Sequence, residues 1–239
     1  MSISIPDDRR IYAVGDIHGM RLPLLDLLSK IDNDIKGNVQ DPEMAHLVFL
    51  GDYVDRGTDS KAVLDLLTSD LPAPATFLAG NHEQTLLRFL LEPEIVDQWR
   101  YFGGLETLTS YGVDVKEVRI GRGFAAARDA FVERLPQSHL RFFQHLQPSA
   151  ESGEYFFCHA GVRPGVPLDR QDPRDLMWIR EEFLNFDGPF EKTIVHGHTP
   201  GEEVYIGRHR INVDTGAYAT RKLSAICLSG PSRRAISSG

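Results

Sequence analysis

Two carboxylates, an arginine and two glycines follow directly on the apolar run at residues 47–50, in the stretch GDYVDRG at residues 51–57. If the run is a buried strand, these residues stand at its carboxyl end, where α/β proteins commonly build their sites. Asp52 could then reach a metal ion, Asp55 could orient an acid or base, and Arg56 could bind a phosphate group. Taken alone, however, the stretch is more typical of an ordinary turn with a solvated arginine.

The same pattern, an apolar run that ends in glycine and polar residues, recurs at four other places in the chain. Five of the nine histidines lie in these four clusters. Because loops that follow neighbouring strands converge, we expect the clusters to form one site. The clusters read GDIHG at residues 15–19, GNHE at 80–83, HAG at 159–161 and HGHTP at 196–200.

The side chains in these clusters have the chemistry of a metal centre. Asp16 and His18 are two residues apart, so an extended backbone directs both to the same side. Asp52 and Asn81 add oxygen donors. Oxygen and imidazole donors without thiolate suit Mn²⁺, Fe or Zn²⁺ rather than a structural Cys-bound zinc. A carboxylate shared by two ions roughly 3.5–4 Å apart creates a centre that can lower the pKa of a water and direct it at phosphorus.

Strands, glycine-bearing loops and amphipathic helices alternate in the first part of the chain. Leucine and isoleucine at helical spacing predict a helix over residues 23–37, and a second amphipathic helix is predicted over 60–69. Core strands are predicted at residues 11–14, 46–50 and 75–79. This alternation predicts an α/β fold.

The sequence changes character after residue 92. Residues 92–150 are rich in aromatic side chains and show helical patterns at 124–135 and 139–146, but they hold no cluster with evident chemistry. We predict a mainly helical insertion that covers the site and shapes substrate access. A plain packing role for its aromatic residues is an equal alternative.

The remaining part of the chain returns to strands. A short helix is predicted over residues 175–184, with Arg180 near its middle. Residues 230–239 are rich in Gly, Ser and Arg and are expected to form a flexible tail. Strands are predicted at residues 155–158, 193–195, 208–213 and 222–228, the last two indicating a second sheet.

The length, composition and charge of the chain exclude several classes of protein. The chain has 239 residues, 41% of them hydrophobic and 25% charged, without an internal repeat or long linker, which predicts a single catalytic domain over residues 1–239. The net charge of −8 argues against sequence-independent nucleic-acid binding, although local arginines can still bind a phosphorylated substrate. The two cysteines give no disulfide framework. Without a leader pattern or a membrane-length apolar run, we expect a cytoplasmic protein with no membrane partner.

In this order, the five clusters resemble the signature of the PPP-type metallophosphoesterases, the family of the protein serine/threonine phosphatases and of their bacterial and phage relatives. The resemblance spans residues 11 to about 228. The compact length and the segment WIR at residues 178–180 are similar to bacterial and phage members. The family implies a metallophosphoesterase-type four-layer sandwich, in which helices flank two central mixed β-sheets.

The resemblance also implies two divalent metal ions, with Mn²⁺ favoured and Fe or Zn²⁺ as alternatives. Spacing alone admits both His196 and His198 as ligands, because alternate strand residues face the same side. The family pattern favours His198, which leaves His196 in a structural role. By position, the ligands it implies are Asp16 and His18 for the first ion, Asp52 as the bridge, and Asn81, His159 and His198 for the second.

The same resemblance implies the catalytic groups. His82 becomes the general acid that protonates the leaving oxygen, and Asp55 holds its imidazole; a nearby carboxylate favours the imidazolium. Arg56 and Arg180 bind the phosphate oxygens with their planar donors. Tyr218 is interpreted as a structural strand-end residue rather than one that lines the cleft.

The function implied is metal-dependent phosphomonoester hydrolysis, by in-line attack of a water held between the ions while His82 acts as acid. The leading hypothesis is a protein serine/threonine phosphatase whose activity extends to phosphotyrosine. The alternative is a symmetrical dinucleoside polyphosphate hydrolase or another small-phosphoester hydrolase. The motifs recognise only the phosphate, so they do not separate a phosphoprotein from a small substrate.

Two readings from other classes fit less well. Cys227 and Arg233 have the spacing of a cysteine-phosphatase loop, but the chain ends too soon for the helix that such a loop requires. Cys227 and Cys158 are therefore interpreted as apolar strand residues. A binding module without activity should lack a ligand or the acid, and none of these residues is missing here.

Overall fold

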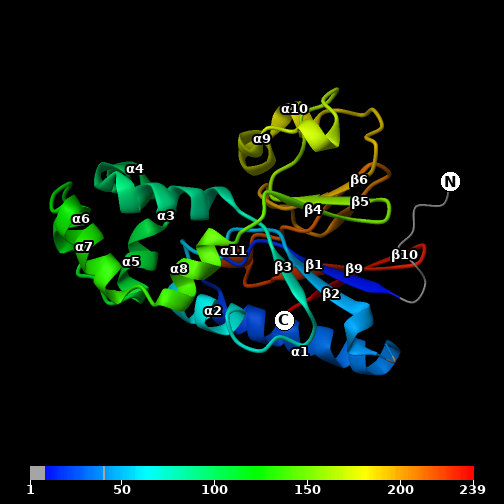
Figure 1. Ribbon diagram of the computed structural model, residues 1–239, viewed down its shortest axis with the longest axis horizontal. Helices are drawn as coiled ribbons and strands as arrows, with labels where there is room; N and C mark the ends of the chain where they lie inside the picture. The colour runs from blue at the N-terminus through cyan, green and yellow to red at the C-terminus, as the bar shows by residue number, and fades with distance from the viewer. Residues whose placement is uncertain (1–8, 40) are drawn as a thin grey trace.

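Two mixed five-stranded β-sheets form the centre of the computed structural model, which describes residues 9–39 and 41–239 (Figure 1). The first sheet has the order β10-β9-β1-β2-β3, with β1 at Arg10–Val14, β2 at Ala45–Phe49, β3 at Ala75–Phe77, β9 at Ser224–Ser229 and β10 at Ser232–Ser237. The second has the order β4-β5-β6-β8-β7, with β4 at Ser149–Ser152, β5 at Tyr155–Cys158, β6 at Thr193–His196, β7 at Tyr205–Ile206 and β8 at Arg210–Asn212.

Parallel pairing brings the carboxyl ends of the central strands level. In the first sheet, β1, β2 and β3 run parallel, with Val14 opposite Phe49 and Phe49 opposite Phe77. In the second sheet, β5, β6 and β8 run parallel. The loops that leave these strands therefore emerge at one edge of each sheet, as the recurring clusters predict.

Helices cover the outer faces of both sheets (Figure 1). The first sheet packs on α1 and α2, and the second on α9 and α10. Short 3₁₀ helices lie at Pro42–Met44, Pro93–Ile95, Arg100–Phe102 and Leu168–Arg170. The α-helices are α1 Arg21–Asn38, α2 Ser60–Leu67, α3 Asn81–Leu91, α4 Val96–Trp99, α5 Gly104–Ser110, α6 Lys116–Arg119, α7 Phe124–Arg134, α8 Gln137–Gln144, α9 Pro173–Trp178, α10 Glu181–Leu184 and α11 Ala217–Thr220.

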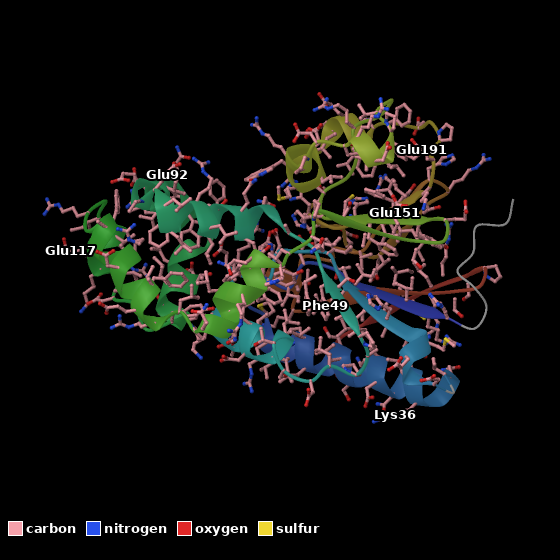
Figure 2. All side chains as sticks on the ribbon, viewed as in Figure 1. Lys36, Phe49, Glu92, Glu117, Glu151 and Glu191 are labelled. Atoms are coloured by element: carbon pink, nitrogen blue, oxygen red, sulfur yellow. The ribbon has the colours of Figure 1, made fainter. Side chains whose placement is uncertain are left out.

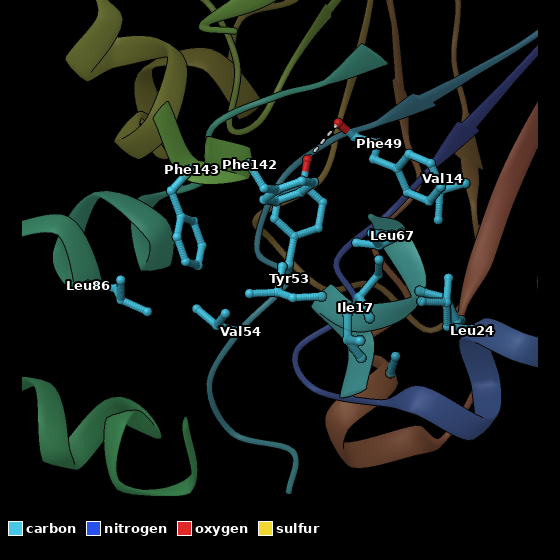
Figure 3. Close-up of a cluster of buried hydrophobic side chains, with 14 of the residues drawn as sticks. Val14, Ile17, Leu24, Phe49, Tyr53, Val54, Leu67, Leu86, Phe142 and Phe143 are labelled. Carbon is cyan, nitrogen blue, oxygen red and sulfur yellow. Dashed lines mark hydrogen bonds between the residues drawn. The ribbon is translucent and has the colours of Figure 1, made fainter. Parts of the chain in front are cut away.

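Three apolar clusters hold the layers together. One lies between the sheets and includes Ile11, Val48 and Phe157, and a second joins the outer face of the second sheet to α9 and α10. The third joins the first sheet to α1, α2 and the insertion; in it Tyr53 donates a hydrogen bond to the Phe49 carbonyl (Figure 3). Helix, sheet, sheet and helix thus form the predicted four-layer α/β sandwich.

The predicted helical insertion is also confirmed. Helices α4 to α8 lie between α3 and β4, and with α3 they form a lobe beside the sheets. Glu92 and Glu117 lie on the outside of this lobe, away from Phe49 in the first sheet (Figure 2).

Three expectations about the later part of the chain are wrong. The flexible tail over residues 230–239 instead contains β10, which pairs antiparallel with β9 along its whole length. Arg233 fixes it further, because its guanidinium donates to the Tyr155 hydroxyl and to the Gly207 carbonyl. The strand at 222–228 does not extend the second sheet, since β9 pairs with β1 in the first. The helix at 175–184 is interrupted between α9 and α10.

Cys227 lies in the middle of β9, as its interpretation as an apolar strand residue predicts. Its neighbours across the sheet are Tyr12 and Arg234. The N-terminal residues 1–8, where no leader was expected, lie outside the described residues. Within the described part of the chain, no helix combines the length and apolar character needed to cross a membrane.

Candidate metal centre

The predicted clusters converge on one site at the carboxyl ends of the parallel strands. Asp16 and His18 follow β1, and Asp52 follows β2. Asn81 and His82 begin α3 directly after β3, and His159 and His198 follow β5 and β6. All of these side chains are buried, so the fold encloses a cluster of polar groups that need partners.

Asp52 lies at the centre of the cluster. Its Oδ2 is 3.5 Å from His18 Nε2 on one side and 3.4 Å from His159 Nε2 on the other. Two groups of side chains with atoms close enough to hold a metal ion share this carboxylate: His18, Asp52 and His82 form one, and Asp52, His159 and His198 form the other.

Backbone carbonyls orient two of the imidazoles. His18 Nδ1 lies 2.9 Å from the Val54 carbonyl oxygen, and His159 Nδ1 lies 2.9 Å from that of Leu50. With Nδ1 donating to a carbonyl, each ring turns its Nε2 toward Asp52. Metal-binding histidines typically use their second nitrogen in this way.

His198 provides a test of whether these residues fit a metal. Its Nε2 is buried and has no hydrogen-bond partner among the described residues. Burial lowers the pKa of the imidazole to about 2, so the ring is neutral and has a lone pair to offer on one of its nitrogens. A neutral imidazole that faces a carboxylate and a second histidine is a ready ligand for a divalent cation. The donor set therefore fits a metal centre.

The charge of the cluster also fits a metal centre. Burial, with Asp214 beside it, raises the pKa of Asp16 well above its usual range, and burial raises that of Asp214 to about 6. Burial also acts to raise the pKa of Asp52. The nearby imidazoles of His159 and His82 outweigh burial, however, and hold the pKa of Asp52 well below its ordinary value. Buried carboxylates this close together need positive charge, which divalent ions supply.

His82 and Asp55 form a hydrogen-bonded pair next to this cluster. His82 Nδ1 lies 2.6 Å from Asp55 Oδ2, and His82 Nε2 lies 3.8 Å from Asp52 Oδ2. Burial lowers the pKa of the His82 imidazole, but the Asp52 and Asp55 carboxylates outweigh burial and raise it above its ordinary value.

The insertion holds the carboxylate of this pair. Trp99 Nε1 donates to Asp55 Oδ2 at 2.6 Å, and Thr107 Oγ1 donates to Asp55 Oδ1 at 2.5 Å. The Gly103 carbonyl accepts from the backbone N–H of Arg56. Helices α4 and α5 thus position the loop after β2, a contribution that goes beyond covering the site.

Two arginines reach the cluster from opposite parts of the chain. The Arg56 guanidinium lies over the Tyr218 ring, 4.2 Å from its centroid, and the same ring contacts His18 edge to face. Arg180 donates from Nη1 to the His198 carbonyl at 3.4 Å and to Thr199 Oγ1 at 3.2 Å.

The sequence profile of the calcineurin-like phosphoesterase family matches residues 9–226. The chain belongs to this family. Among curated relatives, the asymmetrical bis(5'-nucleosyl)-tetraphosphatase PrpE of Oceanobacillus iheyensis is 28% identical over 235 residues, covering 90% of this chain and 87% of the relative. PrpE of Bacillus thuringiensis strain Al Hakam, with the same description, is 27% identical over 231 residues, covering 89% and 88%.

Solved structures share the metallophosphoesterase fold. A proposed diadenosine tetraphosphatase superposes with a TM-score of 0.58 at 21% identity, covering 99% of this chain and 97% of that one. A serine/threonine phosphatase from Saccharomyces cerevisiae superposes with a TM-score of 0.57 at 16% identity, covering 97% and 80%. At these identities the likeness establishes the fold alone.

The structure of this metallophosphoesterase brings every predicted site residue to one place. Two placements differ from expectation. Arg180 does not lie within a helix but in the break between α9 and α10, where it reaches the His198 loop. Tyr218 lies in the short helix α11, not at a strand end, and it contacts both His18 and Arg56, so it lines the site.

His196 is placed apart from the two candidate ligand groups. Its ring packs edge to face on Phe183, and Nδ1 lies 3.0 Å from the Gly197 carbonyl oxygen. Nε2 lies 3.5 Å from an Arg210 nitrogen. These contacts are consistent with the structural role expected of this histidine.

Sequence reasoning missed Glu83, which shapes the loop that carries Asp52. The Glu83 carboxylate accepts hydrogen bonds from the backbone N–H groups of Asp52 at 2.9 Å, Tyr53 at 2.8 Å and Gly80 at 3.1 Å. Asp52 has a φ of 54° and Gly51 a φ of 106°, conformations that favour glycine and need such support. The signal was present, because this buried glutamate closes the GNHE cluster.

Sequence reasoning also missed Asp214, a buried carboxylate beside Asp16. It accepts a hydrogen bond from the Gly216 backbone N–H at 2.8 Å. Nothing in its local sequence distinguishes it from a turn aspartate.

Proposed function

We propose that this metallophosphoesterase hydrolyses dinucleoside polyphosphates and cleaves them asymmetrically. The observation that carries the substrate class is the similarity, across nearly all of both chains, to proteins described as asymmetrical bis(5'-nucleosyl)-tetraphosphatases. The protein-phosphatase hypothesis has no comparable support, because the phosphatase structures resemble this chain at under 25% identity. The comparisons therefore favour the alternative named from the sequence, with asymmetrical in place of symmetrical cleavage.

The proposed ligand set is the one that the family resemblance implies. Asp52 is shared by two ions, and its position between two donor groups supports this role. We propose Mn²⁺, which oxygen and imidazole donors suit. When bound, the ions neutralise phosphate charge and lower the pKa of a water. The other ligands proposed are Asp16 and His18 for one ion, and Asn81, His159 and His198 for the other.

The chain's own groups supply binding and the proton. The planar donors of Arg56 and Arg180 bind the oxygens of the phosphate that is attacked and stabilise the charge that it develops. His82, whose pKa the Asp52 and Asp55 carboxylates raise against the opposing effect of burial, donates a proton from Nε2 to the leaving oxygen. Asp55 fixes the ring so that Nε2 faces the site.

Competing substrates test the proposal. We expect the protein supplied with Mn²⁺ to hydrolyse diadenosine tetraphosphate with a kcat/KM about 100-fold or more above that for a panel of phosphoserine, phosphothreonine and phosphotyrosine peptides. Chromatography of the nucleotides should show ATP and AMP. Two ADP molecules would indicate symmetrical cleavage, and a faster reaction with the peptides would restore the protein-phosphatase hypothesis.

Trp99→Phe tests how the insertion tunes the proposed acid. The variant keeps a large aromatic ring but removes the N–H that donates to Asp55 Oδ2. We expect kcat to fall about 10-fold, as for residues that orient a functional group from behind. Because the freed carboxylate stabilises the imidazolium more strongly, the pKa of His82 should rise and the basic limb of the kcat profile should move to higher pH.

Tyr111→Phe is the matched control for this change. It also removes one buried hydrogen bond of the insertion, from the Tyr111 hydroxyl to His139, but it does not touch Asp55. Its kcat profile should keep the wild-type limb. If both variants lose activity equally without a pH shift, Trp99 acts only through the stability of the lobe.

A further inference from the structure

An exposed tryptophan lies beside the candidate metal centre. Trp178, the last residue of α9, is 43% exposed, whereas Trp99, the other tryptophan of the chain, is buried. The Trp178 ring centroid lies 6.5 Å from that of His198, and its Nε1 donates to Gln84 Oε1 at 2.8 Å. The hydrogen bond fixes the indole while much of its surface stays open.

Trp178 lines a hollow of about 530 Å³, a volume within the range of small-molecule sites. Three arginines line the same hollow. Arg163 is neutralised by ion pairs with Asp175 and Glu182. Arg174 and Arg180, in contrast, pair with no carboxylate that the structure describes. Two further carboxylates, those of Asp172 and Glu181, also line the hollow, so its charge is mixed. The hollow offers an oriented aromatic surface and two arginines outside those ion pairs, at the edge of the phosphate site.

We propose that this hollow binds the nucleoside attached to the phosphate that is attacked, with its base stacked on Trp178. The inference rests on the proposed function and assigns it a recognition site. Purine rings stack on exposed indoles because both present flat, polarisable faces, and an indole held by a hydrogen bond loses little freedom on binding. Arg180 then binds the phosphate, and Arg174 adds positive charge near it.

The closeness of the two groups favours one nucleoside of the substrate. Trp178 and Arg180 are two residues apart, and both contact the segment that carries His198. From this closeness we infer that one ribose separates the base from the attacked phosphate. This arrangement fits the AMP half of a substrate that is cleaved asymmetrically. Symmetrical cleavage places a further phosphate between the base and the attacked phosphorus.

Tryptophan fluorescence tests the subsite without turnover. The protein supplied with Mn²⁺ is titrated with AMP and, separately, with inorganic phosphate. We expect AMP to quench the emission saturably and phosphate to leave it unchanged, because only AMP brings a base to Trp178. Trp178→Phe, which retains only Trp99, should show no quenching by AMP. Equal quenching by both ligands, or quenching that persists in Trp178→Phe, contradicts the proposal.

Kinetics provide the second measurement. In Trp178→Ala, kcat/KM for diadenosine tetraphosphate should fall about 10- to 100-fold, the size of a lost stacking contact, while turnover of p-nitrophenyl phosphate changes little. Trp178→Phe should recover much of the loss. Tyr205→Ala, which removes an exposed aromatic ring from β7, is the matched control and should behave as wild type. A parallel loss on both substrates refutes a base-binding role.

The two measurements also separate this inference from the proposed function. If the wild-type protein fails to hydrolyse diadenosine tetraphosphate, the proposed function fails. Saturable quenching by AMP through Trp178 would still support a nucleoside subsite. If the dinucleotide is hydrolysed but AMP does not quench Trp178, the proposed function stands and the subsite is wrong.

Discussion

His82→Asn is expected to lower kcat about 10²- to 10⁴-fold, the usual contribution of a positioned general acid, while both metal ions stay bound. The asparagine keeps a polar side chain near Asp55 but has no proton to give at neutral pH. Steady-state kinetics give kcat, and elemental analysis of the purified variant gives its metal content. His46→Asn removes a half-buried histidine that bonds to Thr76 and serves as control.

Metal content decides between two roles for His82. Its Nε2 lies close to Asp52, and His82 belongs to one of the two groups that could hold an ion. Its Nδ1, however, is engaged with a carboxylate and not with a carbonyl as in His18 and His159. That difference supports an acid, since the carboxylate raises the pKa of the ring. Loss of metal in His82→Asn would instead identify a ligand.

The role of His82 as general acid can also be tested by changing the leaving group and the pH. An acid contributes little when the leaving group is already a stable anion, so His82→Asn should lose less activity with p-nitrophenyl phosphate than with phenyl phosphate. In the wild type, activity should fall as pH rises through the raised pKa of His82, because the protonated ring is the active form. The variant should lack this basic limb. An unchanged limb would point to another group as the acid.

The cluster of buried polar residues at the strand ends could be predicted because its signals are local. Asp16, Asp52 and His159 each follow an apolar strand directly, and parallel strands bring such positions to a common edge. The family pattern then selected His198 over His196, which spacing alone could not do. The structure places His198 against Asp52 and buries His196 against Phe183.

The parts that could not be predicted depend on distant contacts. Trp99 reaches Asp55 across 44 residues of sequence, and its aromatic neighbours in the insertion look like ordinary packing residues. The interruption of the helix at Arg180 could not be predicted either, because apolar residues continue at helical spacing on both sides of it. Its backbone leaves the helical region, with φ −132° and ψ −99°, where its side chain reaches His198. The strand at the C-terminus could not be predicted, because the contacts that hold it are distant in sequence. One of them joins Arg233 to Tyr155 in the other sheet.

Asp52→Asn should abolish activity through loss of metal, which distinguishes it from the loss of the acid. An amide carries no charge and cannot offer two equivalent anionic oxygens to two ions. We expect metal affinity to fall by more than about 100-fold, the upper range for changes in residues that only orient ligands. Metal content measured after gel filtration, together with kcat, tests this expectation.

The consequences of this substitution extend to His159. Burial acts to lower the pKa of that imidazole, but Asp52 outweighs burial and raises the pKa to about 10. Without the carboxylate the pKa of His159 should fall, and its neutral ring can still bind one ion. The ligand shared by both ions is nevertheless missing, so adding Mn²⁺ should restore little activity to Asp52→Asn. Asp34→Asn, which removes a carboxylate bonded to Tyr12 and Arg234, should keep both metal and activity. Full metal content in Asp52→Asn, equal to that of the wild type, would show that Asp52 is not the shared ligand, and the bridge would then have to be sought among Asp16 and Asp214.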